Sequence, residues 1–180
     1  AVLKACENGM PIKGVFLPMV RSYSQVEQLN ELLLKSAHPL EIVPMIETVK
    51  GVKQLTDMLK KDKINNLFSR VHYGHFDYSA DAKLWPFPDP YHNYFWELIT
   101  PIVKQLAAYK KSYVHTPFPF PQDESLFWES AYHLSLIEPD LEVWACTVNA
   151  GLSLLAQPKK IAKLEIKTYN FSKEQRIAEA

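Results

Sequence analysis

Two kinds of hydrophobic pattern follow one another along this chain, one typical of strands and one typical of helices. The pair repeats about every 30 residues, the length of a βαβ unit. Short apolar runs without strict alternation are typical of strands buried on both faces of a parallel sheet. Five such runs occur, at residues 14–20, 41–46, 64–73, 111–115 and 141–146. We expect each of them to form a strand.

Between these runs, apolar residues recur every three or four positions, which predicts helices. Ser24 and Glu27 form a capping-box pattern before the first helix, and Thr48 precedes the second. The third helical pattern contains Pro101, which is expected to kink that helix or mark its start, and Asp123 is expected to cap the fourth. The second helix has the clearest apolar stripe, made of Val49, Val52, Leu55 and Leu59.

Strands that are joined by helical crossovers form a parallel sheet. Five βα units fit either an open, doubly wound sheet or part of a (β/α)8 barrel. No Gly-rich phosphate-binding turn follows any predicted strand, which counts against a nucleotide-binding open sheet. We therefore expect residues 1–180 to form a single α/β domain of TIM-barrel type, with about five of the eight units.

Charge and composition restrict the partners. The chain has 20 basic and 20 acidic residues and a formal net charge of zero. Binding to nucleic acid or to an anionic membrane calls for a basic patch, so neither partner is expected. The apolar stretches are short and broken by charged residues or proline, which argues against a transmembrane helix. The two cysteines are far apart, so we expect no disulfide framework and a cytoplasmic location.

Both ends of the chain read as parts of helices. Residues 2–8 have the pattern of a helix that has already begun, and residues 177–180 stop within a helical pattern. A partial barrel also leaves strand edges unpaired and apolar faces uncovered. We therefore expect a homo-oligomer or a partner polypeptide that completes the barrel.

Two carboxylates stand out because each follows its own apolar run. Glu47 comes directly after the second run, and Asp77 comes shortly after the third. In an α/β barrel, the carboxyl ends of the strands meet at one mouth, where the functional site lies. Two carboxylates placed there can hold a hard divalent cation, with water completing its octahedron. Oxygen ligands without soft donors favour Mg²⁺ or Mn²⁺ over Zn²⁺.

Three segments around these carboxylates carry a family resemblance. They are Leu-Pro-Met-Val-Arg-Ser at 17–22, Val-Pro-Met-Ile-Glu-Thr at 43–48 and Gly-His-Phe-Asp-Tyr-Ser-Ala-Asp at 74–81. In sequence and in spacing they resemble the second half of the barrel in the citrate lyase β-subunit / hydroxy-ketoacid aldolase family. Glu47 and Asp77 match the metal-binding Glu and Asp of that family.

The resemblance implies a metal-dependent carbon–carbon lyase or aldolase on a TIM barrel. Its substrate would be a 2-oxo acid or an acyl-coenzyme A thioester, and Mg²⁺ (or Mn²⁺) would stabilise the enolate formed when the carbon–carbon bond breaks. A base would have to accept the proton of the hydroxyl group.

Three residues are candidates for the catalytic work. Arg21 ends the first strand, where its guanidinium could clamp a substrate carboxylate. His75 shares a face with Asp77 if the third strand keeps its alternation to the end. His115 follows the fourth strand, before a Pro-rich segment. Asn149, after the fifth strand, is a further candidate, while Asp81 is either a support for the metal site or a solvated turn residue.

Departures from the family pattern keep two other functions open. The family's fourth-strand motif has Lys and Glu where this chain has Met19 and Arg21, residues 145–148 replace a His-Pro pair, and the first three strands of the barrel are missing. The chain could therefore be a non-catalytic or incomplete barrel module that serves binding or assembly. A third hypothesis is an unrelated open α/β enzyme in which Glu47 and Asp77 are helix caps.

The aromatic segment at 85–96 would be a lid over the mouth or a contact with a neighbouring subunit.

Overall fold

The computed structural model describes residues 2–35, 39–85, 87–116, 120, 123–137 and 142–143. The helices are α1 (Val2–Glu7), α2 (Tyr23–Leu33), α3 (Val49–Asn65), α4 (His75–Asp81), α5 (Asn93–Ala108) and α6 (Glu124–Ile137). The strands are β1 (Gly14–Leu17), β2 (Glu41–Ile46), β3 (Arg70–Tyr73), β4 (Ser112–His115) and β5 (Glu142–Val143).

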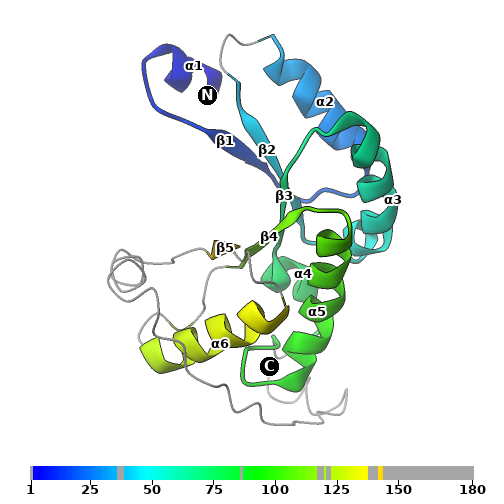
Figure 1. Ribbon diagram of the computed structural model, residues 1–180, viewed down its shortest axis with the longest axis vertical. Coiled ribbons are helices and arrows are strands. Elements are labelled where there is room, and N and C mark those ends of the chain that lie inside the picture. The colour runs from blue at the N-terminus through cyan, green and yellow to red at the C-terminus, as the bar shows by residue number, and fades with distance from the viewer. Residues whose placement is uncertain are drawn as a thin grey trace.

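The order of the strands identifies the architecture. The sheet runs β1-β2-β3-β4-β5, and each neighbouring pair is parallel. Each crossover therefore moves the chain one strand further in the same direction, as in a (β/α)8 barrel. A doubly wound sheet would instead reverse direction at a switch point. In Figure 1 the strands form an arc with β1 at one end and β5 at the other. The prediction of a partial TIM-barrel-type α/β fold is confirmed.

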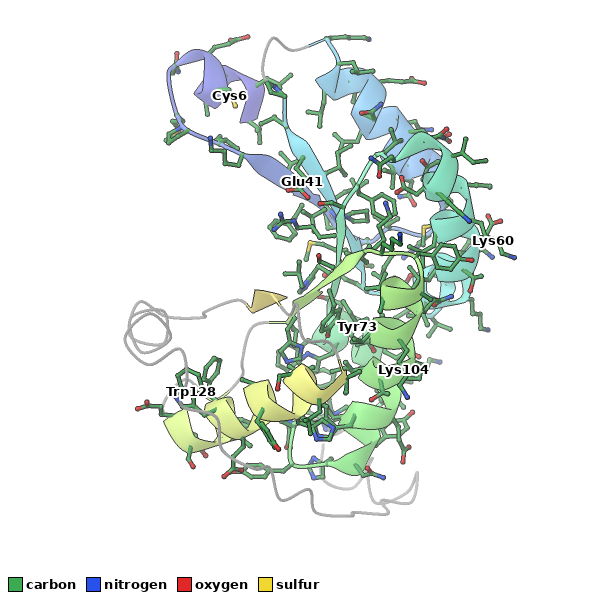
Figure 2. All side chains as sticks on the ribbon, viewed as in Figure 1. Cys6, Glu41, Lys60, Tyr73, Lys104 and Trp128 are labelled. Atoms are coloured by element: carbon green, nitrogen blue, oxygen red, sulfur yellow. The ribbon has the colours of Figure 1, made fainter. Side chains whose placement is uncertain are left out.

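Helices cover one face of this arc. Figure 1 shows α2, α3 and α5 on the same side of the strands, and α2 and α3 contact β2 while α5 contacts β4. Residues that alternate along the strands fill the space between the two layers: Ile42, Ile46, Val71, Tyr73 and Tyr113. Figure 2 shows Tyr73 among the strands and helices, whereas the exposed Lys60 points away from α3.

The other face of the arc corresponds to the interior of a closed barrel. By alternation it carries Phe16, Val43, Met45, His72 and Val114. The Phe16 ring meets the His72 ring edge to face, with centroids 6.1 Å apart, yet 42% of Phe16 remains exposed. Val43, His72 and Val114 on this face are buried, so the exposed apolar surface here is that of Phe16 on β1, at one edge of the sheet.

Several element boundaries differ from those expected. The third strand begins at Arg70 rather than residue 64, because α3 continues to Asn65 and ends with Asn66 in the left-handed conformation (φ 50°). Helix α2 begins at Tyr23 and its N-cap is Ser22, so the Ser24–Glu27 capping box was wrong. Pro101 lies inside α5 and does not start it.

A buried ion pair fastens the amino-terminal side of the sheet. Lys111, just before β4, donates from Nζ to Asp62 Oδ2 of α3 (2.5 Å) and to the Phe68 carbonyl (2.6 Å). The other oxygen of Asp62 accepts from the Tyr23 hydroxyl (3.1 Å) and from the Leu67 amide (2.8 Å). Buried charges are tolerated when they are paired and hydrogen-bonded in this way. The network ties α2 and α3 to the approaches of β3 and β4.

Cys6 is a free, buried thiol on α1, while Cys146 lies outside the described residues. Throughout the described ranges, no helix is both long and apolar enough to cross a bilayer.

Candidate metal site

Glu47 is the first residue after β2 and stands at the carboxyl end of that strand. It is 5% exposed, an unusual environment for an acidic side chain. Its Oε2 accepts a hydrogen bond from the Met19 amide at 2.8 Å. The next residue, Thr48, caps α3 by accepting from the Gly51 amide at 2.9 Å, as predicted. The carboxylate is therefore fixed at a junction between two secondary-structure elements.

The loop between β1 and α2 supplies the hydrogen-bond donor. Met19 adopts a left-handed backbone conformation (φ 54°), which costs a residue with a Cβ roughly 1–2 kcal/mol. The next amide, that of Val20, donates to the Met45 carbonyl on β2 (3.0 Å). Strained backbone of this kind tends to occur at functional sites. The loop is thus bound to the end of β2 at two points, the Met45 carbonyl and the Glu47 carboxylate.

Gly74 closes the other side of the carboxylate. It follows β3, its amide donates to the Ile46 carbonyl (3.1 Å), and it is the N-cap of α4. A Cβ on Gly74 would lie 2.6 Å from both Cγ and Oε1 of Glu47. The position must therefore be glycine for Glu47 to occupy its place. Sequence reasoning gave neither Met19 nor Gly74 a role in holding Glu47, although both stand in the motifs at 17–22 and 74–81.

Asp77 lies in the first turn of α4 and is exposed. The strand ends at Tyr73, so the expected strand alternation linking Tyr73, His75 and Asp77 was wrong. The pKa of Glu47 is raised above its ordinary value, chiefly because burial disfavours the charged form. The Met19 hydrogen bond lowers this pKa, and the negative charge of Asp77 raises it. The two carboxylates thus interact electrostatically across the ends of neighbouring strands.

Asp81 has a structural partner. Its Oδ2 accepts from the amide of Val49, the first residue of α3, at 2.8 Å. A carboxylate at a helix N-terminus satisfies an amide that would otherwise lack a partner within the helix. Asp81 is exposed, as expected of a solvated residue, but it ends α4 rather than standing in a turn, and it ties that helix to the segment that follows Glu47.

Arg21 lies on the loop between β1 and α2, two residues beyond Met19, and is exposed. Its amide donates to Gln25 Oε1 (2.8 Å), which also accepts from the Ser22 amide. No ion pair of the Arg21 guanidinium occurs with the residues that the structure describes. Because β1 ends at Leu17, Arg21 does not end the first strand as predicted but lies on the loop that follows it.

The two candidate histidines lie in the core, contrary to the expected position at the mouth. His75 is 1% exposed, its Nδ1 lies 3.0 Å from Thr116 Oγ1, and its ring packs on Phe95 of α5. His115 is 3% exposed, with Nδ1 3.0 Å from the Tyr113 hydroxyl. Burial lowers the pKa of His75 to about 4 and that of His115 to about 3. Both are neutral at pH 7, and their surroundings favour a structural role.

The donors at the mouth suit a hard cation that retains water. In the described parts of the chain, no group of three or more His, Cys, Asp or Glu side chains is placed to hold a metal ion. Mg²⁺ is commonly bound through one or two carboxylates, with waters and substrate oxygens as the other ligands. The tightly enclosed Glu47 and the nearby Asp77 match that donor set. Asn149 and residues 145–148 lie outside the described residues.

Solved structures with the same fold are citrate lyase β-subunits and related proteins. One is the citrate lyase β-subunit of Mycobacterium tuberculosis complexed with oxaloacetate and magnesium (TM-score 0.58, 16% identity, 77% of this chain and 58% of that chain). Another is RipC from Yersinia pestis (TM-score 0.64, 16% identity, 85% and 66%). A third is a citrate lyase from Burkholderia xenovorans (TM-score 0.62, 14% identity, 79% and 48%).

No protein-family model matches the chain, and no curated protein matches its sequence. The chain spans less than two thirds of the length of each of the three structures named above. At these identities the likeness concerns the fold. The motifs at 17–22, 43–48 and 74–81 and the described fold thus agree: the described part of this chain has the fold of part of the citrate lyase β-subunit barrel.

Proposed function

We propose that this chain is a metal-dependent carbon–carbon lyase or aldolase whose metal site is formed by Glu47 and Asp77. The observation that carries the proposal is the placement of Glu47. It is a buried carboxylate enclosed by Met19 and Gly74 at a strand end, close enough to Asp77 for their charges to interact. Folding such a carboxylate into a buried position costs free energy, and a bound cation offsets this cost.

Mg²⁺ or Mn²⁺ would supply Lewis-acid stabilisation of the negative charge that develops on the substrate oxygens. Glu47 would bind through Oε1, because Oε2 is bonded to the Met19 amide. Asp77, exposed on α4, would contribute the second anionic oxygen. Arg21, exposed on the neighbouring loop, would pair with the substrate carboxylate and set its orientation.

The proposed substrate is a 2-oxo acid or an acyl-coenzyme A thioester, in keeping with the family that the motifs resemble. The oxaloacetate and magnesium bound to the Mycobacterium tuberculosis protein support the oxo acid. His75 and His115 are not included as the base, because both side chains are buried against α5. We further propose that residues 1–180 form one domain and that the protein is cytoplasmic. It would associate with itself or with a partner that completes the barrel.

A change at Asp77 tests the metal site. Asp77→Asn removes one of two anionic ligands while keeping the shape of the side chain, so Mg²⁺ binding in a calorimetric titration should be lost. Asp81→Asn is the matched control, because Asp81 lies on the same short helix and bonds to Val49. It should bind Mg²⁺ as the wild type does. Unchanged Mg²⁺ affinity in Asp77→Asn would rule out the proposed ligand pair.

A second candidate function is a non-catalytic module for binding or assembly. It is favoured by Phe16, an apolar side chain that is 42% exposed on the inner face of the sheet. This function predicts weak or absent metal binding together with tight association. The lyase proposal predicts metal binding that a 2-oxo acid strengthens.

A further inference from the structure

The two oxygens of Glu47 have different surroundings. Oε2 is occupied by the Met19 amide at 2.8 Å. Oε1 faces Gly74, where even a methyl group would come within 2.6 Å of it, and it accepts no hydrogen bond from any residue in the described ranges. One oxygen of the carboxylate is therefore hydrogen-bonded to the backbone, whereas the other lies against Gly74 without a hydrogen bond from the described residues.

The surrounding backbone allows little rotation of this carboxylate. The Val20 amide bonds to Met45 and the Gly74 amide bonds to Ile46, so both sides of the enclosure are attached to β2, the strand that leads into Glu47. We expect that presenting both oxygens to one ion would compete with the Met19 hydrogen bond at Oε2 and press the carboxylate against Gly74.

We propose that Gly74 and the Met19 amide are positioning elements that restrict Glu47 to binding a cation through Oε1 alone, which makes the site selective for Mg²⁺ and Mn²⁺ over Ca²⁺. Ca²⁺ takes six to eight oxygen ligands and often binds a carboxylate through both oxygens, whereas Mg²⁺ requires a compact octahedron that is completed by water. A carboxylate held to one oxygen deprives Ca²⁺ of a ligand and suits Mg²⁺. The inference rests on the proposed function, because it takes Glu47 as a metal ligand.

Gly74→Ala tests the restriction directly. The added methyl group displaces Glu47, so exchange of the Met19 amide hydrogen, followed by NMR, should become at least tenfold faster. Mg²⁺ affinity should fall by about 10- to 100-fold, the usual effect of losing a group that orients a metal ligand. Ca²⁺ affinity should fall less than Mg²⁺ affinity, so the ratio of Mg²⁺ affinity to Ca²⁺ affinity should be smaller than in the wild type.

Gly14→Ala is the matched control. A Cβ at Gly14 would lie 2.7 Å from the backbone carbonyl oxygen of Glu41, a clash at the opposite end of β2 that does not involve Glu47. It should lower the unfolding midpoint while leaving Met19 exchange and the Mg²⁺/Ca²⁺ ratio as in the wild type. A Gly74→Ala chain that keeps wild-type exchange and selectivity would overturn the inference.

The wild-type chain gives a second test that needs no variant. Saturation with Mg²⁺ should leave the Met19 amide protected, because the ion binds Oε1. Loss of that protection would show that the ion takes both oxygens, and the inference would fail. Metal binding without preference for Mg²⁺ over Ca²⁺ would overturn the inference alone, whereas binding of neither ion would overturn the proposed function as well.

Discussion

The amide of Met19 donates to Oε2 of Glu47 across 2.8 Å, and it does so from a left-handed backbone conformation. The bond joins the end of the first described strand to the end of the second. The strained backbone of Met19 lowers the stability of the fold, whereas the hydrogen bond from the same residue positions the Glu47 carboxylate. We therefore expect folding stability and metal binding to respond differently to changes at Met19.

Substitutions at Met19 should reveal this strain. Both Met19→Gly and Met19→Ala remove the thioether, but only glycine adopts φ 54° without a steric cost. We expect Met19→Gly to exceed Met19→Ala by about 1 kcal/mol in unfolding free energy, measured by urea denaturation. The same pair at Met10, whose φ is not positive, should favour alanine. If the alanine variant were more stable than the glycine variant at Met19 as well as at Met10, the backbone strain inferred at Met19 would be refuted.

The pairing of Lys111 with Asp62 should be costly to break. Lys111→Met leaves the carboxylate of Asp62, which is 0% exposed, without its counter-charge, so unfolding free energy should fall by about 3–5 kcal/mol. Lys61→Met is the control, because Lys61 pairs with Asp57 where both side chains are more than half exposed. That change should cost less than about 0.5 kcal/mol. Similar losses in the two variants would refute the role given to the buried network.

The buried histidines should make the fold sensitive to acid. Burial lowers the pKa of His115 to about 3, below its ordinary value of 6.5, so the folded chain excludes a proton that the unfolded chain binds. Its stabilising contribution is present above pH 6.5 and is lost as the pH falls towards 3. A plot of unfolding free energy against pH should therefore be less steep for His115→Gln between pH 6 and pH 4, by about 1.4 kcal/mol per pH unit. An unchanged slope would show that His115 does not carry this linkage.

The exposed Phe16 on the edge strand β1 should promote association. Phe16 is 42% exposed on the face that would be the interior of a closed barrel, so we expect the chain to associate at micromolar concentration in sedimentation velocity. Phe16→Ser should weaken association by removing apolar area. Leu34→Ser, at a 74% exposed position just after α2, should not. A wild-type chain that is monomeric throughout this range would count against the expectation.

Periodicity was sufficient to predict the larger elements of the fold. The stripe of Val52, Leu55 and Leu59 indicated α3, and the strand of 41–46 was found at the predicted bounds. Periodicity failed where the backbone geometry at the end of a helix, rather than the hydrophobic pattern, determines the boundary. The apolar residues of 64–69 fall partly in the last turn of α3, which ends with left-handed Asn66, and partly in the loop before β3.

The sequence was enough to name Glu47 and Asp77 as candidates, whose role as metal ligands stays a prediction, but it did not indicate the geometry around them. Glu47 and Asp77 could be singled out because each follows an apolar run. The short helix α4 was missed, and with it the inward direction of His75. Seven residues give too little periodicity to indicate a helix. The Met19 amide could not be found from side-chain chemistry, because a backbone donor leaves no mark in the sequence.

The most direct test of the central claim is a calorimetric titration of the purified chain with Mg²⁺ and Mn²⁺, with and without oxaloacetate or pyruvate. If Glu47 and Asp77 form a metal site that shares its ion with a 2-oxo acid, the metal should bind and the oxo acid should tighten that binding. Absence of metal binding, both with and without the oxo acid, would contradict the account.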